Sequence, residues 1–295
     1  MFRRPPTRSA PRRRGALRFT LASTAFSVAL SGCGVIDFIT GNDGYLDGVG
    51  RIPGGEFNSL VSLPEGVEIQ FPELIGPMIG PQIGGNRVLM IGDSIMASTS
   101  SRYGNEMCNM LTPLGWQVAV EAQAGSFVDF GLKVLGRRLE DGWDTAVVFL
   151  GTNFDGNLEN YESVLRQIFN ALAPTPMVVL TTAEFRPRQI DVNNVILNLA
   201  KEYENITVLD WAKIAANPGV IGRDGIHLSD NGRDVFSVAV ARSLELPPVR
   251  EGKCIDSVFR NDSAVKVPMP SEAAVDDTSA PAVDPAQGEA STTLP

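Results

Sequence analysis

The chain has 295 residues, 43% of them hydrophobic and 20% charged, which is enough apolar material for one large α/β domain or two smaller ones. Its net charge of -9 is unevenly distributed, because seven arginines and no acidic residue precede Cys33, leaving 18 basic residues against 34 acidic ones after it. A chain this acidic is repelled by nucleic acids and by anionic membrane surfaces, so we expect neither as a direct partner and expect a neutral or small ligand.

Residues 1–32 have the pattern of an export signal. An arginine-rich start is followed by the apolar run from Leu21 to Leu30, which is too short to span a membrane. The letters Leu30-Ser31-Gly32-Cys33 resemble the lipobox of bacterial lipoproteins, in which the cysteine is lipidated and becomes the first residue of the mature protein. This resemblance implies a lipid anchor at Cys33 and a location on the outer face of the cytoplasmic membrane or in the cell envelope. An ordinary secretory signal is the alternative, and the export route stays open.

Glycine and proline recur every few residues from 33 to 86, so the apolar residues there have neither the spacing of a helix nor that of a strand. We interpret this stretch as a lipidated tether that lifts a domain off the membrane and lies partly against its surface.

From Arg87 onward, apolar runs alternate with helical patterns. Strictly alternating β and α units predict a single three-layer α/β/α domain over residues 87–255, built on a five-stranded parallel sheet. The composition of residues 256–295 predicts a disordered acidic tail. The predicted strands are Val88 to Ile91, Gln117 to Glu121, Thr145 to Leu150, Met177 to Thr182 and Ile206 to Leu209, and the predicted helices are Ile95 to Leu114, Phe127 to Leu139, Leu158 to Leu172, Val192 to Tyr203 and Asp230 to Leu246.

The three cysteines fit an exported protein. If Cys33 is lipidated, Cys108 and Cys254 remain as an even pair. We expect a disulfide between them, which would fasten the C-terminal end of the domain to its first helix.

Gly92-Asp93-Ser94 follows the first predicted strand and places a hydroxyl at its carboxyl end, where open α/β sheets bind ligands. A serine nucleophile needs a base and a group that orients the base. The chain has one histidine, His227, and Asp224 precedes it by three residues in a turn made tight by Gly225. Because His227 follows the last predicted strand, it is expected at the same sheet edge as Ser94. A capping serine and a structural loop histidine are the alternatives.

Donors for an oxyanion hole are found at successive strand ends. The candidates are the amide of Ser94, the amide of Gly125 and the side-chain amide of Asn153. Each is also a common residue of a β-to-α turn.

These four blocks, Gly92-Asp93-Ser94, Gly125, Gly151-Thr152-Asn153 and Asp224-Gly225-Ile226-His227-Leu228, resemble those of the SGNH hydrolases, also called GDSL esterases. The resemblance implies a flavodoxin-like fold, Ser94 as nucleophile, His227 as base, Asp224 as its partner, and Ser94, Gly125 and Asn153 as the oxyanion hole. It is strongest to SGNH domains attached to bacterial membrane acyltransferases that acylate envelope glycans. Phe154 departs from the family's usual third block, Gly-x-Asn-Asp.

The sequence therefore predicts a membrane-anchored serine esterase that removes short acyl groups from an envelope glycan or glycolipid. An O-acyltransferase with a sugar acceptor and a non-catalytic binding lipoprotein are the alternatives. No cofactor is expected, and one histidine makes a metal site improbable. The stretch from Thr182 to Arg186 is either part of the substrate pocket or a surface loop. The oligomeric state is not predicted.

Overall fold

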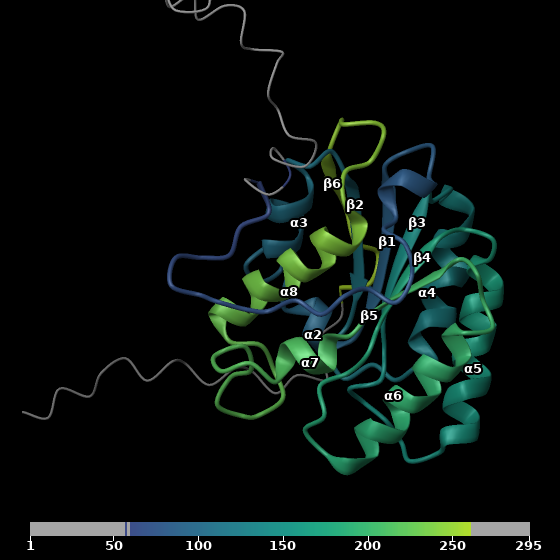
Figure 1. The fold of residues 1–295 in the computed structure, drawn as a ribbon. Coiled ribbons are helices and arrows are strands. Elements are labelled where there is room, and N and C mark those ends of the chain that lie inside the picture. The colour runs from purple at the N-terminus through teal and green to yellow at the C-terminus, as the bar shows by residue number, and fades with distance from the viewer. Residues whose placement is uncertain (1–56, 58–59, 261–295) are drawn as a thin grey trace, which may run out of the picture. The chain divides into compact units, whose positions relative to one another are not determined.

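The computed structural model describes residue 57 and residues 60–260 of the chain. Six strands run through this part: β1 (Arg87–Gly92), β2 (Gln117–Ala122), β3 (Thr145–Phe149), β4 (Met177–Leu180), β5 (Ile206–Leu209) and β6 (Lys253–Ile255). They form one sheet in the order β5-β4-β3-β1-β2-β6, and every neighbouring pair is parallel (Figure 1). The predicted α/β domain with a parallel sheet is confirmed, with one strand more than the five expected.

Helices cover both faces of the sheet (Figure 1). One face carries α2 (Ser94–Ala97), α3 (Glu106–Leu111), α7 (Trp211–Ala215) and α8 (Asp230–Leu244). The other carries α4 (Phe130–Arg138), α5 (Leu158–Leu172) and α6 (Pro187–Ala200). Successive strand residues point to opposite faces, so Val88 and Met90 of β1 join one hydrophobic core while Leu89 and Ile91 join the other.

The predicted helix from Ile95 to Leu114 is two short helices instead of one. After α2 the chain turns through residues 98–105, and Asn105 adopts a left-handed conformation with φ of 63° before α3 begins. A left-handed residue cannot continue a right-handed helix, so the helical spacing of apolar residues is interrupted there. Two other elements, α7 and β6, were not expected from the sequence.

The predicted disulfide is present: Cys108 of α3 and Cys254 of β6 are joined, with their Cα atoms 5.8 Å apart. It fastens the edge strand β6 to a helix that packs on the sheet.

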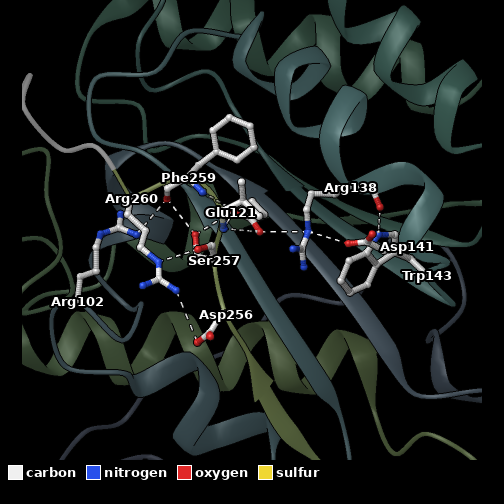
Figure 2. A network of polar contacts seen from close by, with 10 residues as sticks. Arg102, Glu121, Arg138, Asp141, Trp143, Asp256, Ser257, Phe259 and Arg260 are labelled. Carbon is white, nitrogen blue, oxygen red and sulfur yellow. Dashed lines mark hydrogen bonds and ion pairs between the residues drawn. The ribbon is translucent and has the colours of Figure 1, made fainter.

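Beyond β6, residues 256–260 are held on the domain by the buried Glu121 of β2 (Figure 2). The Glu121 carboxylate accepts hydrogen bonds from the amides of Val258 and Phe259, at 2.9 and 3.0 Å, and from the Ser257 hydroxyl at 2.9 Å. It also forms an ion pair with Arg138 at 3.2 Å. A buried carboxylate requires such donors, so the expected tail does not begin at residue 256. Residues 261–295 lie outside the described residues.

Residues 60–86, called the strap below, cross α8 and reach the β5 edge of the sheet (Figure 1). Ile75 forms an antiparallel bridge with Val208 of β5, and Ile79 is fully buried. The tether was expected to lie partly against the domain, and this described part of it does so. The rest of the tether up to residue 56, the export signal and Cys33 lie outside the described residues. None of the helices in the described part of the chain has the length and apolar character needed to cross a membrane.

Candidate active site

The site lies where the strand order changes direction. From β1 the chain moves to β2 on one side, and it then crosses to β3 on the other side. Helices therefore leave the sheet toward opposite faces at the carboxyl ends of β1 and β3, which opens a crevice there. Ser94 follows β1 and Asn153 follows β3, so both side chains are placed at this crevice.

Asp93 links the turn after β1 to the turn after β3 by hydrogen bonds. It is fully buried, and its carboxylate oxygens accept hydrogen bonds from the amide of Ile95 at 3.1 Å and the amide of Thr152 at 3.2 Å. Burial raises the pKa of Asp93 to about 6, although these hydrogen bonds lower it in part. The turn after β1 is thus fixed relative to the turn after β3.

The three residues proposed for nucleophilic chemistry are in contact. His227 Nδ1 lies 2.6 Å from Asp224 Oδ2, and His227 Nε2 lies 3.2 Å from Ser94 Oγ. In the tautomer with a proton on Nδ1, the ring donates to Asp224 and accepts from the Ser94 hydroxyl. The structure therefore brings together the three residues at the spacing that serine catalysis requires.

The turn from Asp224 to His227 is preassembled by local hydrogen bonds. Asp224 Oδ1 accepts the amides of Ile226 at 3.0 Å and His227 at 2.9 Å, and Gly225 adopts a φ of 73° that lets the chain turn back. Partial burial raises the pKa of Asp224. The hydrogen bonds from these amides and from the His227 ring lower it by more than burial raises it, so the pKa of Asp224 lies below its ordinary value. Asp224 is therefore held as a carboxylate beside the imidazole.

The oxyanion candidates follow three neighbouring strands: Ser94 comes after β1, Gly125 after β2 and Asn153 after β3. Gly125 has a φ of 74° after β2, and no hydrogen bond to another described residue occupies its backbone amide or that of Ser94. Asn153 uses one side-chain amide hydrogen to donate to the Ser126 carbonyl at 3.1 Å, which leaves the other free. This bond also links the loop that carries Gly125 to the turn that carries Asn153.

A pocket of about 220 Å³ opens beside Ser94 and His227. Its apolar wall is made of Phe127, Phe154, Phe185 and Ile226, of which Phe127 belongs to none of the sequence motifs. Phe154, which stands where the resembled family has an acid, is buried and packs edge-to-face on Tyr161 at 5.9 Å between ring centroids. A packed aromatic ring therefore takes the place of an acid at this position.

The stretch from Thr182 to Arg186 contributes to this pocket through Phe185 and Arg186, and Arg188 joins them. Nothing in the sequence marked Arg188, because its role depends on where α6 begins. Among residues 57 and 60–260, no group of three or more His, Cys, Asp and Glu side chains is arranged to hold a metal ion.

No protein-family model matches the chain. Among curated proteins, it is 22% identical over 161 residues to YrhL of Bacillus subtilis, a candidate peptidoglycan O-acetyltransferase. The match covers 54% of this chain and 24% of that protein, so the chain spans about a quarter of its relative's length. This similarity confirms the resemblance to acyltransferase-associated domains that the motifs predict.

Solved structures with a similar fold include a lipase/acylhydrolase from Enterococcus faecalis, with a TM-score of 0.47, 21% identity, and coverage of 53% of this chain and 94% of that one. Another is the C-terminal catalytic domain of peptidoglycan O-acetyltransferase A from Streptococcus pneumoniae, with a TM-score of 0.45 and 20% identity. That match covers 54% of this chain and 93% of the other.

Proposed function

We propose that this chain is a serine esterase that removes short acyl groups from a glycan or glycolipid of the cell envelope, to which it is anchored through lipidated Cys33. The observation that supports it best is the continuous relay from Asp224 through His227 to Ser94, with separations of 2.6 and 3.2 Å. Ser94 and His227 also line a pocket of about 220 Å³, a size that suits a short acyl group.

The first half-reaction acylates the serine. Ser94 Oγ attacks the carbonyl carbon of the ester while its proton passes to His227 Nε2, and Asp224 stabilises the resulting imidazolium. The negative oxygen of the tetrahedral intermediate is bound by the amides of Ser94 and Gly125 and by the Asn153 side chain. The intermediate collapses as His227 returns the proton to the leaving alcohol.

The second half-reaction releases the acyl group. A water molecule gives a proton to His227 and attacks the acyl-serine, and the collapse of this second intermediate yields a carboxylic acid and restores the Ser94 hydroxyl. If a sugar hydroxyl takes the place of water, the same steps give an O-acyltransferase. The similarity to a candidate O-acetyltransferase favours that second function.

The test is turnover of p-nitrophenyl acetate by purified Ser94→Ala and His227→Ala. Each variant is expected to lose at least about 10³-fold in kcat, because the nucleophile and its base act as a unit. A fluorophosphonate probe is expected to label the wild type and not Ser94→Ala.

Ser163→Ala is the matched control, since Ser163 is an exposed serine of α5, and it should match the wild type. Undiminished turnover in Ser94→Ala or His227→Ala would rule out the assignment of Ser94, His227 and Asp224 as a catalytic triad. Absence of probe labelling and of turnover in the wild type would favour a non-catalytic binding lipoprotein. Product analysis with acetylated donors and sugar acceptors separates hydrolysis from transfer.

A further inference from the structure

Two arginines line the wall of the pocket beside Ser94. Arg186 and Arg188 both contribute to it, and no acidic side chain does. This positive wall stands out because the chain carries 34 acidic residues against 25 basic ones. The global charge led to the expectation of a neutral or small ligand, but the local field in a pocket is set by the charges nearest to it.

The turn that carries the arginines is fixed to the active site. Asn193 of α6 accepts a hydrogen bond from the Thr182 amide at 2.7 Å and donates to the Thr182 carbonyl at 2.9 Å. The buried Gln189 side chain donates to the carbonyl of Thr152, next to Asn153, at 3.4 Å. The segment is therefore attached through Gln189 to the turn that carries Asn153, while Asn193 fixes α6 to the chain that follows β4.

Both guanidinium groups remain available for a ligand. Arg188 makes no ion pair with any of the described residues. Arg186 lies over the Phe185 ring at 5.4 Å, a contact that orients the guanidinium without neutralising it. The nearby Glu184 carboxylate accepts a hydrogen bond from Asn193 at 3.2 Å and does not line the pocket.

We propose that Arg186 and Arg188 bind an anionic oxygen group, a carboxylate or a phosphate, carried on the same molecule as the ester that Ser94 attacks. This proposal rests on the proposed function and narrows its substrate to acidic acylated glycans or glycolipids. Guanidinium groups bind such oxygen pairs with two parallel hydrogen bonds. The N-terminus of α6, which begins at Pro187, adds a favourable potential at the same place.

The test compares matched substrates with one acetyl ester each: a methyl glucuronide, its neutral uronamide and a methyl glucoside 6-phosphate. Wild-type kcat/KM for acetate release is expected to be at least about tenfold higher for an anionic substrate than for the uronamide. The preference should shrink as sodium chloride rises from about 50 to about 500 mM. Whether the carboxylate or the phosphate gains more identifies the anion.

The variant Arg186→Ala/Arg188→Ala is expected to lose most of this preference, because its kcat/KM should fall about tenfold more on the anionic substrates than on the uronamide. Arg137→Ala, an exposed arginine of α4, is the matched control and should keep the preference. If no acetylated sugar is turned over, the unacetylated compounds are compared as inhibitors of p-nitrophenyl acetate hydrolysis, with the same ranking expected.

Equal use of anionic and neutral substrates by the wild type, or an equal loss on both in the double variant, would overturn the proposal. Such a result alongside normal turnover of p-nitrophenyl acetate leaves the proposed esterase intact. Absence of all turnover would instead count against the esterase itself.

Discussion

At the scale of single residues, Asp93 couples two turns of the site through one buried carboxylate. Its hydrogen bonds from the amides of Ile95 and Thr152 set the position of Ser94 relative to Asn153. Because burial raises its pKa to about 6, Asp93 is ionised at neutral pH and takes up a proton in mildly acidic solution. Folding therefore favours the protonated side chain in the window between the ordinary and the raised pKa.

This gives a prediction for stability against pH. Since the pKa of Asp93 rises from 3.8 to about 6 on folding, its contribution to the free energy of unfolding is full below about pH 4 and is lost as the pH passes through 6. The loss is on the order of 3 kcal/mol. Asp93→Asn cannot titrate, so urea unfolding should show the wild type losing this amount relative to Asp93→Asn between pH 4 and 7. Ser94→Ala, which changes the same turn without removing a carboxyl group, should run parallel to the wild type; parallel curves for Asp93→Asn would contradict the assignment.

The contact of Ser94 with His227 and Asp224 could be predicted from the sequence, because it follows from the order of the strands and loops along the chain. In a parallel sheet, residues that follow strands lie at one edge, and a lone histidine leaves no competing base. The arginines of the pocket could not be predicted in this way. Their position depends on α6 beginning at Pro187, five residues before the start that the apolar spacing indicated.

At the scale of elements, the C-terminal segment 256–260 serves as a cover for β2. Without the Ser257 hydroxyl and the amides of Val258 and Phe259, the buried Glu121 carboxylate would keep only its ion pair with Arg138. The segment also reaches the loop of the site: Arg102 donates to the carbonyls of Phe259 and Ala122, and Phe259 packs edge-to-face on Phe130. These contacts lie on both sides of the loop that carries Gly125.

Replacing Glu121 should therefore release this segment. Glu121→Leu removes the acceptor of two amides and leaves Arg138 with only Asp141 as a charged partner, so the free energy of unfolding is expected to fall by about 3 kcal/mol. Hydrogen exchange of the amides at 258 and 259 should accelerate.

Glu121→Gln keeps an acceptor oxygen and should lower the free energy of unfolding by less. Asp256→Asn alters an exposed side chain of the same segment and should change stability by less than about 0.5 kcal/mol. Wild-type stability and exchange in Glu121→Leu would show that the segment is held by other contacts.

The predictability of the elements follows from how much apolar surface each one buries. Strands β1 to β5 have buried runs of Val, Leu, Ile and Met, and all were expected within two residues of their observed ends. Strand β6 has only Lys253, Cys254 and Ile255, two of them exposed, so its sequence has no strand pattern. Its pairing with β2 is a tertiary contact supported by the disulfide and by Glu121.

At the scale of the whole described molecule, segments that precede and follow the alternating β and α units lie along the two sides of the sheet. The C-terminal β6 covers the β2 side, and the strap covers the β5 side through two hydrogen bonds between Ile75 and Val208, at 3.0 and 2.9 Å. An open strand edge is a template for aggregation. A stretch rich in glycine and proline can thus be part of the folded unit, because its few apolar side chains pack on the domain.

Ile79 tests whether the strap belongs to the fold. It is fully buried in the core between the sheet and α8, and its amide donates to the Ser243 carbonyl at 3.2 Å. Ile79→Ala leaves that backbone bond in place and removes only buried carbon atoms, so the free energy of unfolding should fall by about 2 to 5 kcal/mol. Met78→Ala, next to it and 44% exposed, is the matched control and should cost less than about 0.5 kcal/mol. Urea unfolding of both variants, with light scattering to detect aggregation, provides the measurement.

If the strap were a tether resting loosely on the surface, both variants would unfold like the wild type. A loss confined to Ile79→Ala would instead mean that the folded unit begins upstream of Arg87 and that any anchor at Cys33 acts through a shorter free linker than the spacing of glycine and proline suggests.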